Sequence, residues 1–458
     1  MRRILLAGLA SAVALSGLAL APAPAAALTP EEVVWCVSAF SRNPKPSACM
    51  AAIHAFRCAN RDNAYERKVQ IGACTEASES ANWTSWDLAE IFINRGTAYQ
   101  VDEHRDEAIA DYSQAIRLDH DAAVAFYDRG QVYHDKGDLE HAIADYSEAI
   151  RLDSGFSSAF ADRGSAYRLQ GEFALAIADY SKAIRLGRRG DAAYHPFESY
   201  FGRATAYRAT GRFDDAIADY SEALRNTEDD RAVIGRGLTY LAKGDLERAL
   251  ADINKAADED DEDPQPFTYR GILHLYSFGT REAVLNFYEA WWRSDDPYVA
   301  LWLDITRARG HRPSRLAKHA KALATDKWPG PIVRLYLGET TEDAVLATAD
   351  DPDPRIKTAH LCEANFFAGA LAVSHGANDA AERFLRSATA PGCTLIIAWA
   401  ANAELKALGA TPSNELIGRT VGDRHENDEF PRLPIMKYPP PLPVAPVSHR
   451  PPARTLSL

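Results

Sequence analysis

The strongest candidate for a chemical centre is the segment around His360, which lies two residues before Cys362 and three before Glu363. A histidine beside a cysteine is the pair of groups that catalysis by a thiolate uses. The same cysteine can instead form a disulfide with Cys393. Gly-rich phosphate loops, GxSxG and HExxH are missing from the sequence, and its 13 histidines are scattered. We therefore expect a structural role for Cys362, no enzyme activity, no catalytic residue, no metal site and no cofactor.

Two columns of polar residues recur at a fixed spacing in the middle of the chain. An arginine is followed sixteen residues later by an aspartate in five places and by an asparagine in a sixth. The columns are compatible with a charged binding stripe or with a ladder of ion pairs between neighbouring helices. We favour the ladder, because both residues flank apolar positions and an unpaired, partly buried aspartate is costly. The pairs are Arg95 and Asp111, Arg129 and Asp145, Arg163 and Asp179, Arg203 and Asp219, Arg236 and Asp252, and Arg270 and Asn286.

These columns belong to a longer repeat, in which the pentapeptide Ile-Ala-Asp-Tyr-Ser begins at residues 109, 143, 177 and 217. Each unit has a small reference residue, with alanine twelve and nineteen residues later and usually a tyrosine sixteen residues later. Apolar residues at steps of three and four predict two amphipathic helices in each unit, with a turn between them. Six units keep this phase, and their reference residues are Gly96, Gly130, Gly164, Ala204, Gly237 and Gly271.

This spacing resembles the tetratricopeptide repeat (TPR), a 34-residue helix–turn–helix unit. The resemblance implies an all-α fold, a right-handed TPR α-solenoid that is a superhelix of antiparallel helix pairs. Because one unit cannot bury its apolar face alone, the units must stack. The proline that the family usually has near the end of the unit is replaced by His120 and Ser154 in two units, which leaves the link between units less rigid.

A concave groove, lined by the first helix of each unit, is the binding surface that such a stack provides. The groove positions follow no motif shared with the family, so no binding residue is transferred from it. We expect extended peptides or helices of partner proteins to bind there. The first-helix residues expected to face the groove are Asn94, Tyr127, Gln131, His134, Arg168, Phe201 and Arg208.

The N-terminal residues 1–27 have the pattern of a signal peptide: a positive start, an apolar run and small residues before Ala27. An uncleaved membrane anchor is the alternative, but the apolar run is short, and no later run is long enough to span a bilayer. We therefore expect an exported, soluble, periplasmic bacterial protein. The net charge of −13 argues against a nucleic acid as partner.

All six cysteines follow this segment, and an even number in an exported protein favours disulfides over free buried thiols. The repeat frame places Cys362 at the first position of a first helix and Cys393 just after a second helix, at the same end of one hairpin. These two are expected to pair. The other four allow three connectivities, of which we favour Cys36 with Cys49 and Cys58 with Cys74. Residues 28–88 are then a cysteine-containing N-terminal cap with a divergent repeat, before the six units in residues 89–296.

Beyond the six units, residues 297–410 form a region of degenerate helices in which the repeat phase returns at Gly369, Ala381 and Leu385. This region resembles the C-terminal part of the "new lipoprotein I" family of bacterial cell-envelope repeat proteins. The resemblance implies an adaptor for cell-wall hydrolases and the proteases that degrade them. The family's lipid-anchor cysteine is absent. The likeness is carried by Trp328, Tyr336, Leu337, Gly338, Glu363, Asn365, Phe366, Glu404 and Leu405.

The last segment, residues 411–458, is proline-rich and lacks helical periodicity, so we expect a disordered or polyproline II tail. Taken together, the patterns predict a non-catalytic periplasmic scaffold that mediates protein–protein interactions in the cell envelope, with cell-wall hydrolases or proteases as candidate partners. The alternative is an envelope hydrolase, or a regulatory subunit of a peptidoglycan-processing enzyme. The identity of the partner and the oligomeric state, including a homodimer, are left open.

Overall fold

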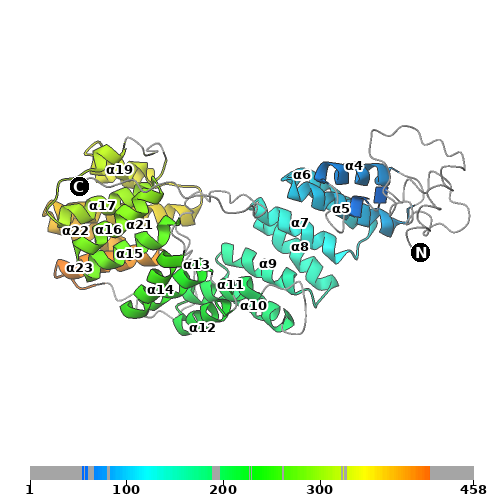
Figure 1. Ribbon diagram of the computed structural model, residues 1–458, viewed down its shortest axis with the longest axis horizontal. Coiled ribbons are helices and arrows are strands. Elements are labelled where there is room, and N and C mark those ends of the chain that lie inside the picture. Colours follow the sequence, from blue (N-terminus) through cyan, green and yellow to red (C-terminus); the bar gives the residue numbers. More distant parts are fainter. Residues whose placement is uncertain are drawn as a thin grey trace, which may run out of the picture. The chain divides into compact units, whose positions relative to one another are not determined.

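The computed structural model describes residues 54–412, except residues 56, 60–65, 80–82, 188–195, 226, 228, 260–261, 321–322 and 324–326. The expected signal peptide, Cys36, Cys49 and the proline-rich tail from residue 413 lie outside the described residues. Within these residues the regular secondary structure is helical, and the chain divides into two compact units, one ending at Ser294 and the other beginning at Asp295 (Figure 1). Each unit is described by itself.

The first unit is a row of antiparallel helix pairs, preceded by α4 (Arg67–Ser78). In each pair the two helices pack along each other, and each second helix also packs against the first helix of the next pair. The predicted α-solenoid is therefore confirmed. The pairs are α5 (Ser85–Val101) with α6 (Arg105–Leu118), α7 (Ala123–Asp135) with α8 (Leu139–Leu152), α9 (Ser157–Leu169) with α10 (Phe173–Gly187), α11 (Pro196–Ala209) with α12 (Phe213–Ala223), α13 (Asp230–Ala242) with α14 (Leu246–Glu259), and α15 (Pro264–Ser277) with α16 (Thr280–Arg293).

The small and large positions of the repeat are explained by the contact between the two helices of a pair. A Cβ atom placed on Gly130 would lie 2.9 Å from the ring of Tyr146, and one on Gly96 would lie 2.8 Å from the ring of Tyr112. Real Cβ atoms do not approach so closely, so in these two units the tyrosine ring occupies the space that a larger residue would need. The first helix α7 ends at Asp135, and Gly137, two residues later, has a φ of 78°, the left-handed conformation that commonly follows the end of a helix.

The arginine and aspartate columns form the predicted ladder. Arg129 Nε and Nη2 donate to the two carboxylate oxygens of Asp145 at 2.8 and 2.7 Å, and its Nη1 donates to Ser113 Oγ of the preceding unit at 2.9 Å. Four other units repeat this geometry, with a serine or Thr75 as the acceptor in the preceding unit. The ladder therefore ties the two helices of each unit together and also joins each unit to the one before it.

The second unit contains one recognisable repeat pair, formed by its long helix α21 and by α22. A Cβ atom on Gly369 would lie 2.7 Å from Leu385, which is the contact that defines the repeat frame. Short helices and turns surround this pair. The helices are α17 (Pro297–Arg309), α18 (Leu316–His319), α19 (Gly330–Tyr336), α20 (Glu342–Thr348), α21 (Pro354–Ser374), α22 (Asn378–Ser387) and α23 (Leu395–Ala407).

Two cysteine pairs lie at bonding distance in the described part of the chain. The sulfur atoms are 2.08 Å apart in Cys58 and Cys74 and 2.04 Å apart in Cys362 and Cys393, as the favoured pairing predicts. The expected position of Cys362 at the start of a helix is wrong. The helix α21 begins at Pro354, because the Asp353 side chain accepts a hydrogen bond from a backbone N–H of the first turn, and Cys362 lies within it.

The centre that looked most chemical in the sequence is packed into the core of the second unit. Glu363 is 1% exposed, and its Oε2 accepts hydrogen bonds from Tyr298 Oη at 2.5 Å and from Trp328 Nε1 at 2.7 Å. The Trp328 ring stacks on His360 with centroids 4.2 Å apart. Burial raises the pKa of Glu363 to about 7. With the Cys362 sulfur at bonding distance from Cys393, the contacts of these residues are packing contacts of the core.

Candidate functional site: a polar cluster on the first helices

The first helices of the six pairs form one continuous surface. The helices α7, α9 and α11 lie along one side of the row, and α8, α10 and α12 lie along the other side (Figure 1). Successive first helices also contact each other, from α5 through α13. We call the surface formed by α5, α7, α9, α11, α13 and α15 the first-helix face. It is the surface on which the sequence predicts partner binding.

All seven residues predicted to line the groove lie on these helices, and their role in binding stays a prediction. Asn94 is on α5, Arg168 is on α9, and Phe201 and Arg208 are on α11. Phe201 packs against Tyr220 with ring centroids 5.9 Å apart, so it also contributes to the core between α11 and α12. The other three, Tyr127, Gln131 and His134, occupy consecutive turns of α7.

Hydrogen bonds connect two of these α7 residues to the neighbouring helix α9. Tyr127 Oη donates to Asp162 Oδ2 at 2.8 Å, and Gln131 Nε2 donates to the same oxygen at 3.2 Å and to Tyr127 Oη at 2.9 Å. His134 is close enough for its charge to act on Asp162. We call the set Tyr127, Asp128, Gln131, His134 and Asp162 the α7–α9 cluster. It joins the first helices of two successive units.

The environment of Asp162 is unfavourable for its charge. Burial raises the pKa of this carboxyl group, and the hydrogen bonds from Tyr127 and Gln131 act in the opposite direction. Burial also raises the pKa of the Tyr127 hydroxyl, which therefore stays protonated and acts as the donor. His134 Nε2 is buried and has no hydrogen-bond partner among the described residues. The cluster thus contains polar atoms whose bonding capacity is left unused by the described residues.

Asp128 is the second carboxylate of the cluster. Burial raises its pKa to about 7. It lies near the Tyr112 hydroxyl, and burial, together with the negative charge of Asp128, raises the pKa of that tyrosine. Tyr112 Oη donates to Gln100 Oε1 at 2.9 Å. The described part of the chain provides Asp128 with neither an ion pair nor a hydrogen bond to its side chain, so a carboxylate lies on the first-helix face without compensation.

Sequence reasoning missed both aspartates, although the repeat frame contains a signal for them. They lie two residues before the reference glycine, a position that holds Gly202 and Gly235 in two later units. A Cβ atom on Gly202 would lie 2.3 Å from Tyr180, and one on Gly235 would lie 2.7 Å from Tyr220. This position therefore faces the tyrosine of the preceding unit. An acidic residue at a position that elsewhere holds glycine is the signal that was available.

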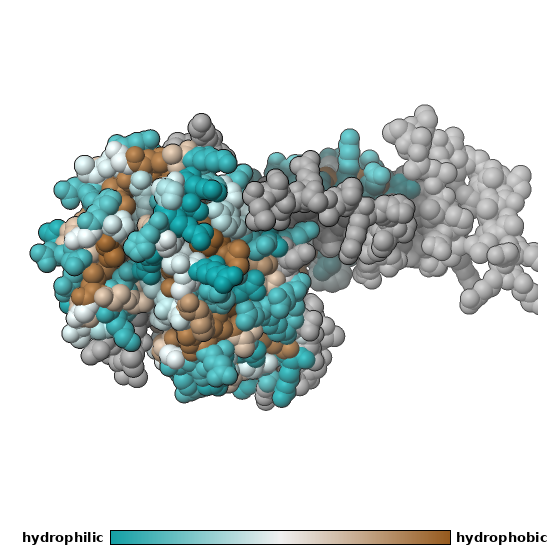
Figure 2. Space-filling model, turned by 60° about the vertical axis from the view of Figure 1, so that its left-hand side comes forward, coloured by the Kyte–Doolittle hydropathy of each residue, from teal (hydrophilic) through white to brown (hydrophobic). Residues whose placement is uncertain are grey.

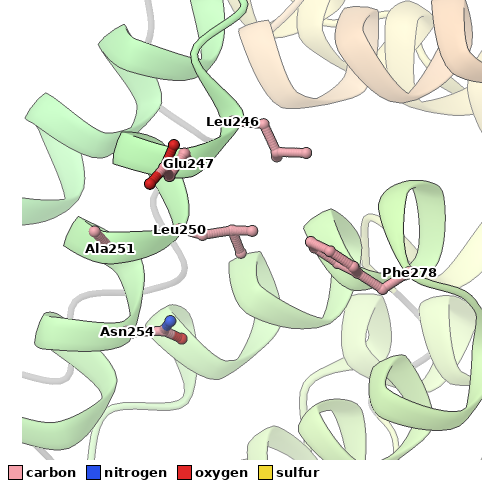
Figure 3. Close-up of a pocket in the computed structure, with 6 residues that line it drawn as sticks. All are labelled: Leu246, Glu247, Leu250, Ala251, Asn254 and Phe278. Carbon is pink, nitrogen blue, oxygen red and sulfur yellow. The ribbon is translucent and has the colours of Figure 1, made fainter.

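A separate apolar depression lies between α14 and the end of α15. It has a volume of about 500 Å³ and is lined by Leu246, Glu247, Leu250, Ala251, Asn254 and Phe278. Figure 3 shows the side chains of Leu246, Leu250 and Phe278 directed into the space between these segments. Phe278 is 60% exposed. The surface in Figure 2 also shows separate hydrophobic patches among hydrophilic residues. The lining offers few polar groups, so the depression is poorly suited to chemistry.

Neither the cluster nor the rest of the described chain contains a metal-binding arrangement. Groups of three or more His, Cys, Asp or Glu side chains that would hold an ion do not occur in residues 54–412 outside the gaps given above. None of the helices in the same residues has both the length and the apolar character needed to cross a membrane.

The tandem helix pairs and their face of first helices define an α-solenoid built for contacts with other molecules. Sequence models of the tetratricopeptide repeat match residues 106–137, 123–156, 157–229 and 201–264. The chain thus contains tetratricopeptide repeats, and the matched residues lie in the first unit. The resemblance of the second unit to the new lipoprotein I family stays a hypothesis.

Several solved structures of repeat proteins are similar to this chain. A tetratricopeptide repeat protein from Parabacteroides merdae is 19% identical, with a TM-score of 0.44 over 56% of this chain and 98% of that one. YrrB, described as a TPR protein with an unusual peptide-binding site, is 20% identical, with a TM-score of 0.35 over 46% and 98%. PilW, described as a widely conserved type IV pilus biogenesis factor, is 17% identical, with a TM-score of 0.38 over 45% and 90%.

Proposed function

We propose that this protein is a non-catalytic adaptor that holds partner proteins on its first-helix face, through extended or helical segments of those partners. Tetratricopeptide repeats serve as scaffolds for protein–protein interaction, and this chain contains such an array. The observation that supports the site is the α7–α9 cluster, where Tyr127, Gln131 and Asp162 form a hydrogen-bonded group across two units. A partner segment lying across successive first helices would meet this group.

We further propose that the adaptor works in the periplasm, with other envelope proteins as partners and with cell-wall hydrolases or proteases as the first candidates. The signal-peptide pattern of residues 1–27 supports export. Two cysteine pairs at bonding distance suit an oxidising compartment. The resemblance of the second unit to envelope adaptors supports the class of partner.

The test is cross-linking of partners to the chain that begins at Leu28, in a periplasmic extract of the source bacterium. The variant Tyr127→Ala with Gln131→Ala removes the hydrogen-bonded group from the face. A matched control is Arg151→Ala, which changes a side chain that is 63% exposed on the second helix α8. We expect the control to retain the cross-linked partners of the wild-type protein and the double variant to lose them. Equal cross-linking by both variants would show that partners bind elsewhere.

A further inference from the structure

We propose that the α7–α9 cluster receives a cationic group of the bound partner, a lysine or arginine side chain or the free amino terminus of a peptide. The inference rests on the proposed function and specifies what kind of segment the first-helix face selects. It is carried by the hydrogen bonds of Asp162, by the pairing of the neighbouring arginines and by the side chains around the two carboxylates.

The first observation is that Asp162 is oriented and incompletely bonded. Both hydrogen bonds that it accepts, from Tyr127 and Gln131, end on Oδ2. Its Oδ1 has no hydrogen-bond partner in the described residues, and Asp128 has none at either oxygen. A carboxylate offers about four acceptor positions, so these two retain most of their capacity to accept hydrogen bonds from a ligand.

The second observation is that the nearest arginines in sequence are already paired. Arg129 follows Asp128 directly, but its Nε and Nη2 donate to Asp145 and its Nη1 donates to Ser113. Arg163 follows Asp162, and it binds Asp179 in the same way. The ladder therefore neutralises the aspartates between the helices of each unit and leaves the pair on the first-helix face without an arginine.

The third observation is that the fold does not need a carboxylate at this position. The equivalent residues in two later units are Gly202 and Gly235, which pack against a tyrosine with no side chain of their own. Asp128 and Asp162 are half-buried, and a carboxylate that loses part of its hydration costs free energy. A cation that binds beside either carboxylate would reduce that cost, which gives the two aspartates a function that the packing of the repeat does not provide.

Aromatic rings beside the carboxylates favour a cation with an apolar stem. The Tyr127 ring lies 4.7 Å from Phe156 and 5.9 Å from Tyr146, measured between centroids. Lysine and arginine bury their methylene groups against such surfaces while the charged end reaches a polar partner. Rings of this kind also attract cations directly. The cluster therefore combines charge acceptors with the apolar contact that a basic side chain requires.

The experiment uses four amidated twelve-residue peptides on an alanine and glutamine background, titrated by calorimetry into the chain that begins at Leu28. The first carries two lysines and an acetylated amino terminus, and the second has norleucine in their place. The third has glutamate there, and the fourth has norleucine with a free amino terminus. We expect the two peptides that carry a positive charge, on lysine or on a free amino terminus, to bind. The norleucine and glutamate peptides with acetylated amino termini should not bind.

The variants locate the site. Asp128→Asn with Asp162→Asn should weaken binding of the lysine peptide by about tenfold or more, because charge-assisted hydrogen bonds are lost. The matched control is Glu107→Gln with Glu140→Gln, which removes the same charge from exposed positions of the second helices α6 and α8 and should change binding little. Circular dichroism of each variant confirms that the helices are intact.

Two results would overturn the inference. One is that the aspartate variant binds the lysine peptide as tightly as the control variant does, and the other is that the lysine peptide binds no better than its norleucine counterpart. The proposed function is judged separately by the cross-linking experiment. If partners cross-link to the aspartate variant as to the wild-type protein but not to the Tyr127 and Gln131 variant, the face binds partners and the cation site is wrong.

Discussion

Replacement of Asp128 by asparagine is expected to stabilise the protein above neutral pH and to have little effect in acid. The pKa of Asp128 is raised to about 7 in the folded state by burial, whereas an aspartate in an unfolded chain has a pKa of about 3.9. The unfolded chain thus loses this proton near pH 4, and the folded protein retains it until about pH 7. Ionisation therefore favours unfolding, and stability decreases as the pH rises from 4 to 7.

The magnitude follows from the difference between the two pKa values. About three pKa units, at 1.36 kcal/mol each, correspond to about 4 kcal/mol of destabilisation once the carboxylate is fully ionised. This is an upper figure for the whole chain, because a repeat array can open near Asp128 while other units stay folded. Asparagine has nearly the same shape and cannot ionise, so it should recover this free energy at pH 8 and little of it at pH 4.

The assay is thermal unfolding followed by circular dichroism between pH 4 and pH 8, for the wild-type protein and for Asp128→Asn. The control is Glu90→Gln, a change at an exposed carboxylate in the middle of α5. We expect the melting temperature of the Asp128 variant to exceed that of the wild-type protein by an amount that grows with pH, while the control shows no such trend. A constant difference, or a variant that is less stable at pH 8, would refute the reasoning from burial.

Other substitutions test the packing of the repeat and the cysteine pairs. Asp145→Ala should destabilise the protein by about 3–5 kcal/mol in urea unfolding, because it leaves a partly buried arginine unpaired. Asp145→Asn should destabilise it less, since the sixth unit has asparagine at this position. Equal losses of stability in the two variants would count against the ion pair. Gly202→Ala should cost about 1–3 kcal/mol through a clash with a tyrosine ring, whereas Gly72→Ala, in open space within α4, should stabilise by up to about 1 kcal/mol. Peptide mapping without reductant should find Cys362 linked to Cys393, and free thiols at these positions would contradict the structure.

The repeat fold could be predicted from the sequence because one contact is used many times. A small residue such as Gly130 and a large apolar side chain such as Tyr146 must keep their spacing in every unit that packs in the same way. Six copies of that constraint leave a clear pattern. The start of α21 was missed because the signal lies in a single turn, where Asp353 caps the helix before Pro354, and one such turn is difficult to distinguish from a loop.

The sequence predicted the site only in part, because the site depends on contacts between neighbouring units. Helical periodicity within α7 selected Tyr127, Gln131 and His134, which lie on consecutive turns of that helix. It could not identify Asp162, because that residue lies on α9, in the next unit, and contacts α7 from there. The periodicity of one helix does not specify how that helix is aligned with its neighbour. Asp128 was missed because its environment depends on the tyrosine of the preceding unit.

The ladder between units has a direction. The arginine on the first helix of five units reaches back to a hydroxyl group that precedes it in the chain, as Arg163 does to Ser147. A chain that emerges N-terminus first, from a ribosome or from an export channel, therefore presents every new arginine to an acceptor that is already folded. If the units fold in the order of synthesis, none of these bonds waits for a unit that has not yet been made. A fragment truncated at its C-terminal end also keeps these bonds in all the units that remain. A fragment cut at its N-terminal side begins with an arginine whose acceptor is gone.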